Sequence, residues 1–173
     1  MSLQGLWEDG PPITFVDHYF SHLGNAVFLS PFDRCAVLTL DGRGEKHTGL
    51  LARVEGTDIE VLHEVMFPHS LGLFYGAVTQ FLGYRPDGDE WKVMALASFV
   101  SGNNEFYPPM RELVSTDERG GFSLALEYFE HFTFWDRRLY SDRFEERFGN
   151  PRAGDEPLDE RHNKIAAAAQ LVF

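Results

Sequence analysis

Hydrophobic positions follow two different periods at the start of the chain. Residues 13–16, Ile-Thr-Phe-Val, form a short apolar, β-prone run that predicts a buried strand. Apolar residues then recur every three or four positions between 20 and 28, which is the spacing of one helix face. Asp17 is suited to cap this helix, and Ser30-Pro31 should end it. The pattern therefore predicts a strand followed directly by a helix.

The next part of the chain has the pattern of a β-sheet. Residues 35–40 form a continuous apolar run, which predicts a central strand opening into the glycine-rich turn 41–45. Two further β-prone runs, 47–54 and 59–67, flank the four-residue turn 55–58 and predict a hairpin. Strands therefore dominate this segment, and the turn after the first of them is a candidate site.

Helical spacing returns at Ser70. Apolar residues repeat every three or four positions from 71 to 82, with Ser70 as the expected N-cap and Gly83 as the expected C-terminal glycine. After a loop rich in proline, aspartate and glycine, residues 91–97 predict a short apolar helix. Two helices in succession are therefore expected here.

The last third is less regular. Residues 100–120 contain several Gly, Asn and Pro residues and are expected to be irregular, with one helical turn near 110–114. The aromatic-rich segment 122–134 fits either a strand or a helix. Short and long helices are expected at 143–148 and 158–173. The whole pattern predicts an α/β fold with a mixed sheet.

Composition narrows the class of protein. The 173 residues include 16 Phe and are 43% hydrophobic, which suits one domain with its own core. With 27 acidic against 15 basic residues the net charge is −12, so a nucleic-acid partner is not expected. A single cysteine, Cys35, allows no internal disulfide, and no apolar run is long enough for a membrane span. We therefore expect a cytoplasmic protein without a membrane partner.

One group of residues has the chemistry of a metal site. His18 and His22 lie four positions apart, which places both imidazoles on one helix face. Asp41 ends the strand that follows this helix, and its carboxylate would complete a set of two histidines and one carboxylate. Such a set suits iron or another divalent ion. The alternative is a coincidental histidine pair on an amphipathic helix.

The turn Asp41-Gly42-Arg43-Gly44-Glu45 is a second candidate, because glycines after a strand let backbone amides approach a phosphate. The alternative is an ordinary hairpin turn, since neither a P-loop nor a dinucleotide fingerprint is present. Lys92, beside Glu90, fits either a phosphate contact or a solvated ion pair. His162, in the predicted last helix, is expected on the surface.

Several stretches together resemble the carbamoyltransferase family that includes nodulation-type and antibiotic O-carbamoyltransferases. The resemblance covers residues 13 to 173 in order and spacing. The stretches that carry it are Val-Asp-His-Tyr-Phe-Ser-His at 16–22, Ala-Val-Leu-Thr-Leu-Asp-Gly-Arg-Gly-Glu at 36–45, Phe-Pro-His-Ser-Leu-Gly-Leu-Phe-Tyr at 67–75, Gly-Asp-Glu-Trp-Lys-Val-Met-Ala-Leu-Ala at 88–97, Phe-Gly-Asn-Pro-Arg at 148–152 and His-Asn-Lys-Ile-Ala-Ala at 162–167.

The resemblance implies a partial actin-like, sugar-kinase-like (ribonuclease H-like) nucleotide-binding fold. It also implies an enzyme that makes a carbamoyl-adenylate from carbamoyl phosphate and ATP and transfers the carbamoyl group to the hydroxyl of a small-molecule acceptor. By matching motifs, the expected metal ligands are His18, His22 and Asp41, and the turn at Gly42 and Gly44 is expected to approach the nucleotide. Glu45 in the same turn and Lys92, near the start of the predicted helix 91–97, are the further expected nucleotide-binding residues, and His22 is also the expected catalytic base.

The chain also departs from the family pattern. Tyr19 and Leu23 stand where the family has His and Ala, and Lys164 replaces an acidic residue. The family's first phosphate loop and its carbamoyl-phosphate-binding domain have no counterpart in residues 1–173. We therefore expect a single partial N-terminal domain of a larger enzyme, inactive alone, with apolar surface that faces the missing downstream domain or a second copy in a homodimer. The alternative is a non-catalytic metal- or nucleotide-binding module of the same fold.

Overall fold

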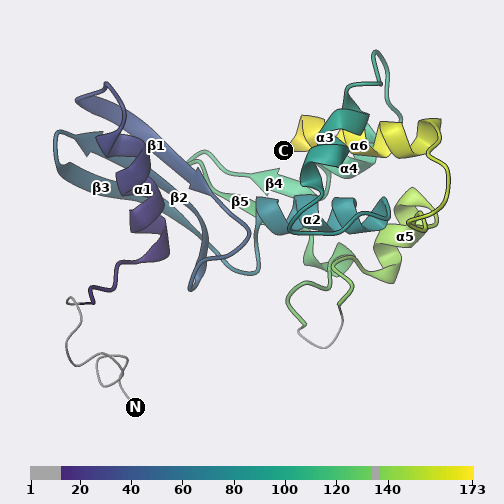
Figure 1. Ribbon diagram of the computed structural model, residues 1–173, viewed down its shortest axis with the longest axis horizontal. Coiled ribbons are helices and arrows are strands. Elements are labelled where there is room, and N and C mark those ends of the chain that lie inside the picture. Colours follow the sequence, from purple (N-terminus) through teal and green to yellow (C-terminus); the bar gives the residue numbers. More distant parts are fainter. Residues whose placement is uncertain (1–12, 134–136) are drawn as a thin grey trace.

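The computed structural model describes residues 13–133 and 137–173. It has two parts that lie side by side along the long axis of the molecule (Figure 1). The sheet part, residues 18–66, consists of one helix and three strands. The helical part, residues 70–173, consists mainly of helices. The chain passes from one to the other just before residue 70, at the N-terminus of α2.

The sheet part is built on an antiparallel sheet in the order β1-β2-β3, from strands β1 (Arg34–Leu40), β2 (His47–Glu55) and β3 (Asp58–Met66). Helix α1 (His18–Phe28) packs on this sheet (Figure 1). The helix begins where expected, because the Asp17 carboxylate accepts hydrogen bonds from the first backbone amides. The buried core of this part consists of Tyr19, Leu23, Val27, Val37, Leu50, Ala52 and Val54.

Two expectations for the strands of the sheet part are wrong. Residues 13–16 form no strand and their side chains are exposed, because within the described residues no neighbouring strand accepts their backbone hydrogen bonds. The strand predicted at 35–40 is present but lies at the sheet edge, since β2 is its one partner strand in the described part of the chain. Its Leu38 is 59% exposed, so the apolar run does not indicate burial on both faces. Phe20 and Phe28, the first and last apolar residues at helical spacing between 20 and 28, are also exposed.

The helical part has the larger core. Its helices are α2 (Leu71–Phe81), α3 (Glu90–Ala97), α4 (Tyr107–Arg111), α5 (Asp142–Phe148) and α6 (Glu160–Val172). This part also contains a small hairpin of β4 (Val114–Thr116) and β5 (Phe122–Leu124), which extends toward the sheet part (Figure 1) and is followed by the 3₁₀ turn η2 (Leu126–Tyr128). Aromatic rings meet in the interior; for example, the ring centroids of Phe81 and Phe144 lie 5.0 Å apart. This core brings together residues from every helix of this part.

Most boundaries in the helical part are confirmed. The Ser70 hydroxyl accepts a hydrogen bond from the Leu73 amide at 3.1 Å and caps α2, and Gly83 ends it with φ of +76°. The helical turn expected at 110–114 lies slightly earlier, in α4. The undecided segment 122–134 contains β5 and η2, while its last residue lies outside the described residues.

His162 is a correction, because it is buried at 6% exposure rather than on the surface. It occupies the N3 position of α6 and forms a capping box with Asp159. The histidine Nδ1 accepts from the Asp159 amide at 3.1 Å, and the Asp159 carboxylate accepts from the His162 amide at 2.9 Å. A residue at N3 thus turns back over the helix end instead of pointing into solvent.

The fold as a whole combines helices with small antiparallel sheets, so the expected mixture of α and β structure is confirmed. The expected mixed sheet is not, because every strand pair in the described residues is antiparallel. Among the residues that the structure describes, none of the helices is both long and apolar enough to cross a membrane.

Candidate metal centre

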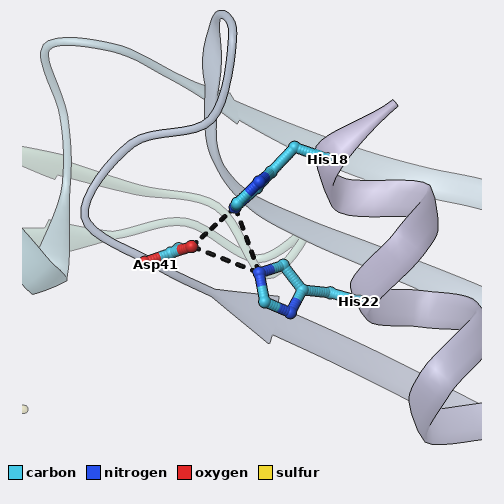
Figure 2. A group of neighbouring side chains, drawn as sticks. All are labelled: His18, His22 and Asp41. Atoms are coloured by element: carbon cyan, nitrogen blue, oxygen red, sulfur yellow. Dashed lines mark hydrogen bonds and ion pairs between the residues drawn. The ribbon is translucent and has the colours of Figure 1, made fainter. Parts of the chain in front are cut away.

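Three predicted ligands meet at one point between α1 and the end of β1 (Figure 2). His18 and His22 project from consecutive turns of α1, and Asp41 is the first residue after β1. The Asp41 Oδ2 lies 2.7 Å from His18 Nε2 and 3.2 Å from His22 Nε2. The two Nε2 atoms lie 3.1 Å apart. We call these residues the triad; they are the one group of three or more such side chains with ligand geometry in the described part of the chain.

The triad cannot satisfy all of its contacts as hydrogen bonds. Each neutral imidazole nitrogen carries either a proton or a lone pair, and the carboxylate only accepts. If both Nε2 atoms donate to Asp41, two N–H groups face each other across the 3.1 Å contact. If one does not donate, its lone pair faces the carboxylate lone pairs. A cation would use the lone pairs of all three atoms at once, and two imidazoles with one carboxylate suit a first-row divalent metal.

The electrostatics of Asp41 agree with this arrangement. Partial burial alone would raise the pKa of its carboxyl group, but hydrogen bonds from His18, the Gly42 amide and His22 outweigh burial and lower it. Asp41 is therefore ionised at neutral pH. The side chains of His18, His22 and Asp41 are 38%, 49% and 38% exposed, so the triad is open on one side.

The position of Asp41 is set by the first turn of α2. The buried Ser70 hydroxyl lies 2.7 Å from the Gly42 carbonyl and 3.1 Å from the Asp41 carbonyl, to which it is positioned to donate. Gly72 approaches the same turn so closely that a Cβ there would lie 2.7 Å from the Gly42 nitrogen. Sequence reasoning missed both roles. The available signal was Gly72 itself, because glycine inside a helix is unfavourable without a packing reason.

The predicted nucleotide-binding residues are only partly brought together. The Gly42 amide donates to the carboxylate of Asp41 at 2.6 Å, and the Gly44 amide donates to the His47 carbonyl at 3.0 Å. Glu45 lies beside the triad, where its carboxylate accepts from the His18 amide at 3.4 Å. The two glycine amides that were expected to approach a phosphate are thus engaged within the turn.

Lys92 lies apart from this group, on α3. Its ammonium group pairs with Asp89 at 2.8 Å and lies 5.5 Å from the ring centroids of Tyr84 and Trp91. It does not line the cavity that borders Asp41 and Gly42. This contact pattern matches the solvated ion pair that was the alternative for Lys92, although the carboxylate is that of Asp89 rather than Glu90.

Comparison with known proteins gives the family. The chain matches the family described as "Carbamoyltransferase N-terminus" over residues 5–173. It is 37% identical over 167 residues to an uncharacterized protein of Synechocystis sp., covering 95% of this chain and 26% of that protein. It is 35% identical over 121 residues to the nodulation protein NolNO of Sinorhizobium fredii. That match covers 69% of this chain and 17% of NolNO.

A third relative is the nodulation protein NolO of Bradyrhizobium diazoefficiens, which is 34% identical over 116 residues, with 65% of this chain and 20% of that protein covered. The chain therefore spans about a quarter or less of the length of these relatives. Because the family match covers nearly the whole chain, the chain belongs to the carbamoyltransferase family.

Proposed function

We propose that this chain is part of an O-carbamoyltransferase that transfers a carbamoyl group from a carbamoyl-adenylate to the hydroxyl of an acceptor. Carbamoyl phosphate and ATP would supply the carbamoyl-adenylate. The family match supports the group that is transferred, and the convergence of His18, His22 and Asp41 on one point is the observation that carries the proposed chemistry.

The proposal includes a larger protein around this chain. The relatives are about four to six times as long as the matched segment, which supports a larger protein around this chain. In the proposal, the chain is a partial domain of an actin-like, nucleotide-binding fold that works with a downstream domain. Exposed apolar side chains on the sheet part, such as Leu38 and Phe28, are consistent with contact to further parts of that protein or to a second copy.

The triad would hold a divalent ion, iron or a similar metal, through His18 Nε2, His22 Nε2 and Asp41 Oδ2. Bound there, the ion would act as a Lewis acid toward the carbamoyl carbonyl oxygen. His22 serves better as a ligand than as a general base, because its Nε2 already faces His18 and Asp41. The open side of the triad leaves room for reactants beside Asp41.

Gly42 supports a nearby nucleotide through its lack of a side chain rather than through a free amide. A Cβ at Gly42 would meet nothing within 4 Å, so the backbone there can be approached closely. Gly44 is packed differently, because a Cβ there would lie 2.7 Å from the Tyr19 ring. In this proposal Gly42 contacts the adenylate, Gly44 and Glu45 shape the turn, and Lys92 has the weakest support of the residues assigned to nucleotide binding.

Metal content of the purified chain tests the proposal. After incubation with ferrous or manganous ion and removal of the excess, we expect about one ion per wild-type chain. The variants His18→Ala and Asp41→Asn should retain almost none. His63→Ala is the matched control, since His63 lies on β3 outside the triad, and it should bind like wild type. Equal metal content in all four proteins would overturn the proposal.

Activity separates the enzyme from a non-catalytic module. With ATP, carbamoyl phosphate and an acceptor, we expect no carbamoylated product from the 173-residue chain and carbamoylated product from a full-length family member that carries the same triad. Loss of that product after replacement of either triad histidine would support the enzyme. Retained metal with no transfer by the full-length protein would favour the module.

A further inference from the structure

Besides the Asp41 turn, the two parts of the molecule meet where the β4–β5 hairpin lies against the sheet (Figure 1). A Cβ at Gly120, in the turn of the hairpin, would lie 3.0 Å from the Leu51 side chain on β2. A Cβ at Gly49 of β2 would lie 3.4 Å from the Phe122 ring on β5. The hairpin therefore helps to fix how the helical part is held on the sheet part.

His69 ties this hairpin to the segment that joins the two parts. Its Nδ1 accepts a hydrogen bond from the Leu124 backbone amide of β5 at 3.1 Å, and its carbonyl oxygen accepts one from the Thr48 hydroxyl of β2. A ring nitrogen that accepts a hydrogen bond must carry a lone pair, so the imidazole is neutral in this arrangement. A proton on Nδ1 would place two N–H groups face to face and break the contact with β5.

A second histidine is buried at the same joining segment. His131 is 8% exposed, and its Nε2 lies 2.8 Å from the Pro68 carbonyl oxygen, to which it is positioned to donate. Its Nδ1 is buried and has no hydrogen-bond partner among the described residues. Burial lowers the pKa of His131, the hydrogen bond to Pro68 opposes that effect, and a charge on His69 lowers the pKa further. A positive charge on either histidine therefore disfavours a positive charge on the other.

The charges around the joining segment do not compensate for protonation. In the described part of the chain neither His69 nor His131 forms an ion pair with a carboxylate, whereas four other histidines do. The Arg43 guanidinium lies 5.6 Å from the centroid of the Phe67 ring, and that ring lies 6.1 Å from the His131 ring. Arg43 thus adds positive charge to the same surroundings, which further disfavours a proton on either histidine.

A third histidine at this contact acts in the opposite sense. His63 of β3 faces Asp117 of the hairpin, because a Cβ at Gly121 would overlap both the His63 Nε2 and the Asp117 Oδ2 atoms. A protonated His63 would attract this carboxylate and strengthen the contact. His63 therefore provides a control within the same interface.

We infer that His69 and His131 form an acid-sensitive latch, which holds the β4–β5 hairpin on the sheet part while both are neutral and releases it when His69 is protonated. Since Ser70 follows His69 directly and holds the Asp41 turn, release also loosens that turn. The latch is fully closed above the ordinary histidine pKa of about 6.5 and opens as the pH falls below it. The latch depends neither on metal binding nor on carbamoyl transfer.

The distance between the two parts tests the latch. Two nitroxide labels are attached at Thr57→Cys, in the exposed β2–β3 turn, and at Ser98→Cys, at the exposed end of α3, in a Cys35→Ser background. Double electron–electron resonance then measures the distances between the labels in the purified 173-residue chain without added metal. We expect one narrow distance distribution at about pH 7.5 and a broad one at about pH 5.5, because histidine changes its charge between these values.

Variants at His69 assign the change to the latch. His69→Asn keeps an acceptor oxygen close to the position of Nδ1 at both pH values, so its distance distribution should stay narrow at both. His69→Leu removes the acceptor and should give the broad distribution at both. His63→Asn is the matched control from the same interface and should broaden on acidification at least as much as wild type. In wild type, the NMR resonance of the Leu124 amide should move over the same pH range as its hydrogen bond is lost.

The inference is overturned if the wild-type distribution stays narrow at the lower pH, if His69→Asn broadens as wild type does, or if the Leu124 resonance does not move. Far-UV circular dichroism is recorded on each sample, and loss of helix at the lower pH would also overturn the inference, since the latch requires two folded parts. Should the His69 variants not fold, the Leu124 resonance and the wild-type distances decide. Because no metal is added, failure of the latch leaves the proposed function unaffected.

Discussion

The sheet part and the helical part bury their apolar residues to different extents. In the helical part the large aromatic residues converge, and Phe74, Phe81 and Phe144 are fully buried. In the sheet part the core is small, while Phe28 and Leu38 are exposed by more than half. The helical part therefore has a large shared core, although Trp91 and Phe99 at its surface are exposed, whereas the sheet part has only a small core beneath α1.

The triad depends on both parts. All three of its residues come from the sheet part, yet the turn that carries Asp41 is held by Ser70 and Gly72 of the helical part. The better-packed part thus positions a ligand that belongs to the less-packed part. We therefore expect substitutions at the start of α2 to weaken the metal site even though they replace none of its three ligands.

The largest effect on stability is expected in the helical core. Phe81→Ala removes a ring that contacts Tyr140 and Phe144 at centroid distances of 5.3 and 5.0 Å. We expect the free energy of unfolding to fall by about 3–5 kcal/mol, measured by urea denaturation. Phe28→Ala is the matched control, and as an exposed ring it should change the value by about 0.5 kcal/mol or less. Equal losses would contradict the difference between the two parts.

The next effect concerns the contact between α2 and the Asp41 turn. A Cβ at Gly72 would press on the Gly42 backbone, so Gly72→Ala should destabilise the protein by about 1–3 kcal/mol and weaken metal binding. Gly76→Ala, one turn later in the same helix, meets only ordinary contacts at 3.5 Å and should be neutral or slightly stabilising. Urea denaturation measures the stability of the two variants, and metal titration measures their affinity for the ion. Identical behaviour of the two variants would show that the close approach does not matter.

Ser70→Ala should have a slightly smaller effect on stability and a specific effect on the triad. It removes the helix cap and the hydroxyl that reaches the carbonyls of Asp41 and Gly42, for a cost of about 1–2 kcal/mol. We expect metal affinity to fall by about 10- to 100-fold, as for other residues that orient ligands. Ser70→Thr keeps the hydroxyl and should restore much of the affinity. An unchanged affinity in Ser70→Ala would limit Ser70 to helix capping.

The smallest effect is on the dependence of stability on pH. Burial lowers the pKa of His131, despite its hydrogen bond with the Pro68 carbonyl, and burial likewise lowers the pKa of His162. Because the folded state disfavours the charged form, these residues stabilise the protein fully above the ordinary histidine pKa. That stability is lost as the pH falls from about 6.5 toward the lowered pKa values.

We therefore expect the urea midpoint to fall between pH 7.5 and pH 5.5 by less in the double variant His131→Gln, His162→Gln than in wild type. Glutamine retains an N–H donor for the Pro68 carbonyl and is a usual residue at the third position of a capping box. An equal fall in both proteins would show that other groups cause the pH dependence.

The local sequence patterns predicted most helices and strands, but they did not predict which strands pair with each other. The cap at Asp17, the hairpin around 55–58 and the cap at Ser70 depend on neighbouring residues, so the sequence predicted them. The strand expected at 13–16 failed because strand formation requires a neighbour that local pattern does not show. For the same reason, the apolar run of β1 could not reveal that this strand lies at an edge.

The candidate site likewise has features that the local sequence predicts and features that depend on contacts between distant segments. The spacing of His18 and His22 follows from helix geometry, Asp41 was added from its place at the end of the next strand, and the family resemblance implied the same three residues. The dependence on Ser70 and Gly72, and the cavity beside them, arise from a contact between segments 28 or more residues apart in sequence. Lys92 was assigned by its position near a helix start, whereas its contacts are with Asp89 and two aromatic rings.

The central claim is that residues of the sheet part, positioned by the helical part, form one metal site. Its most direct test is a crystal structure of the 173-residue chain grown with manganous ion, with diffraction data collected near the manganese absorption edge. The account predicts a single strong anomalous peak at coordination distance from His18 Nε2, His22 Nε2 and Asp41 Oδ2. A fully ordered triad with no peak, or a peak bound by other residues alone, would contradict it.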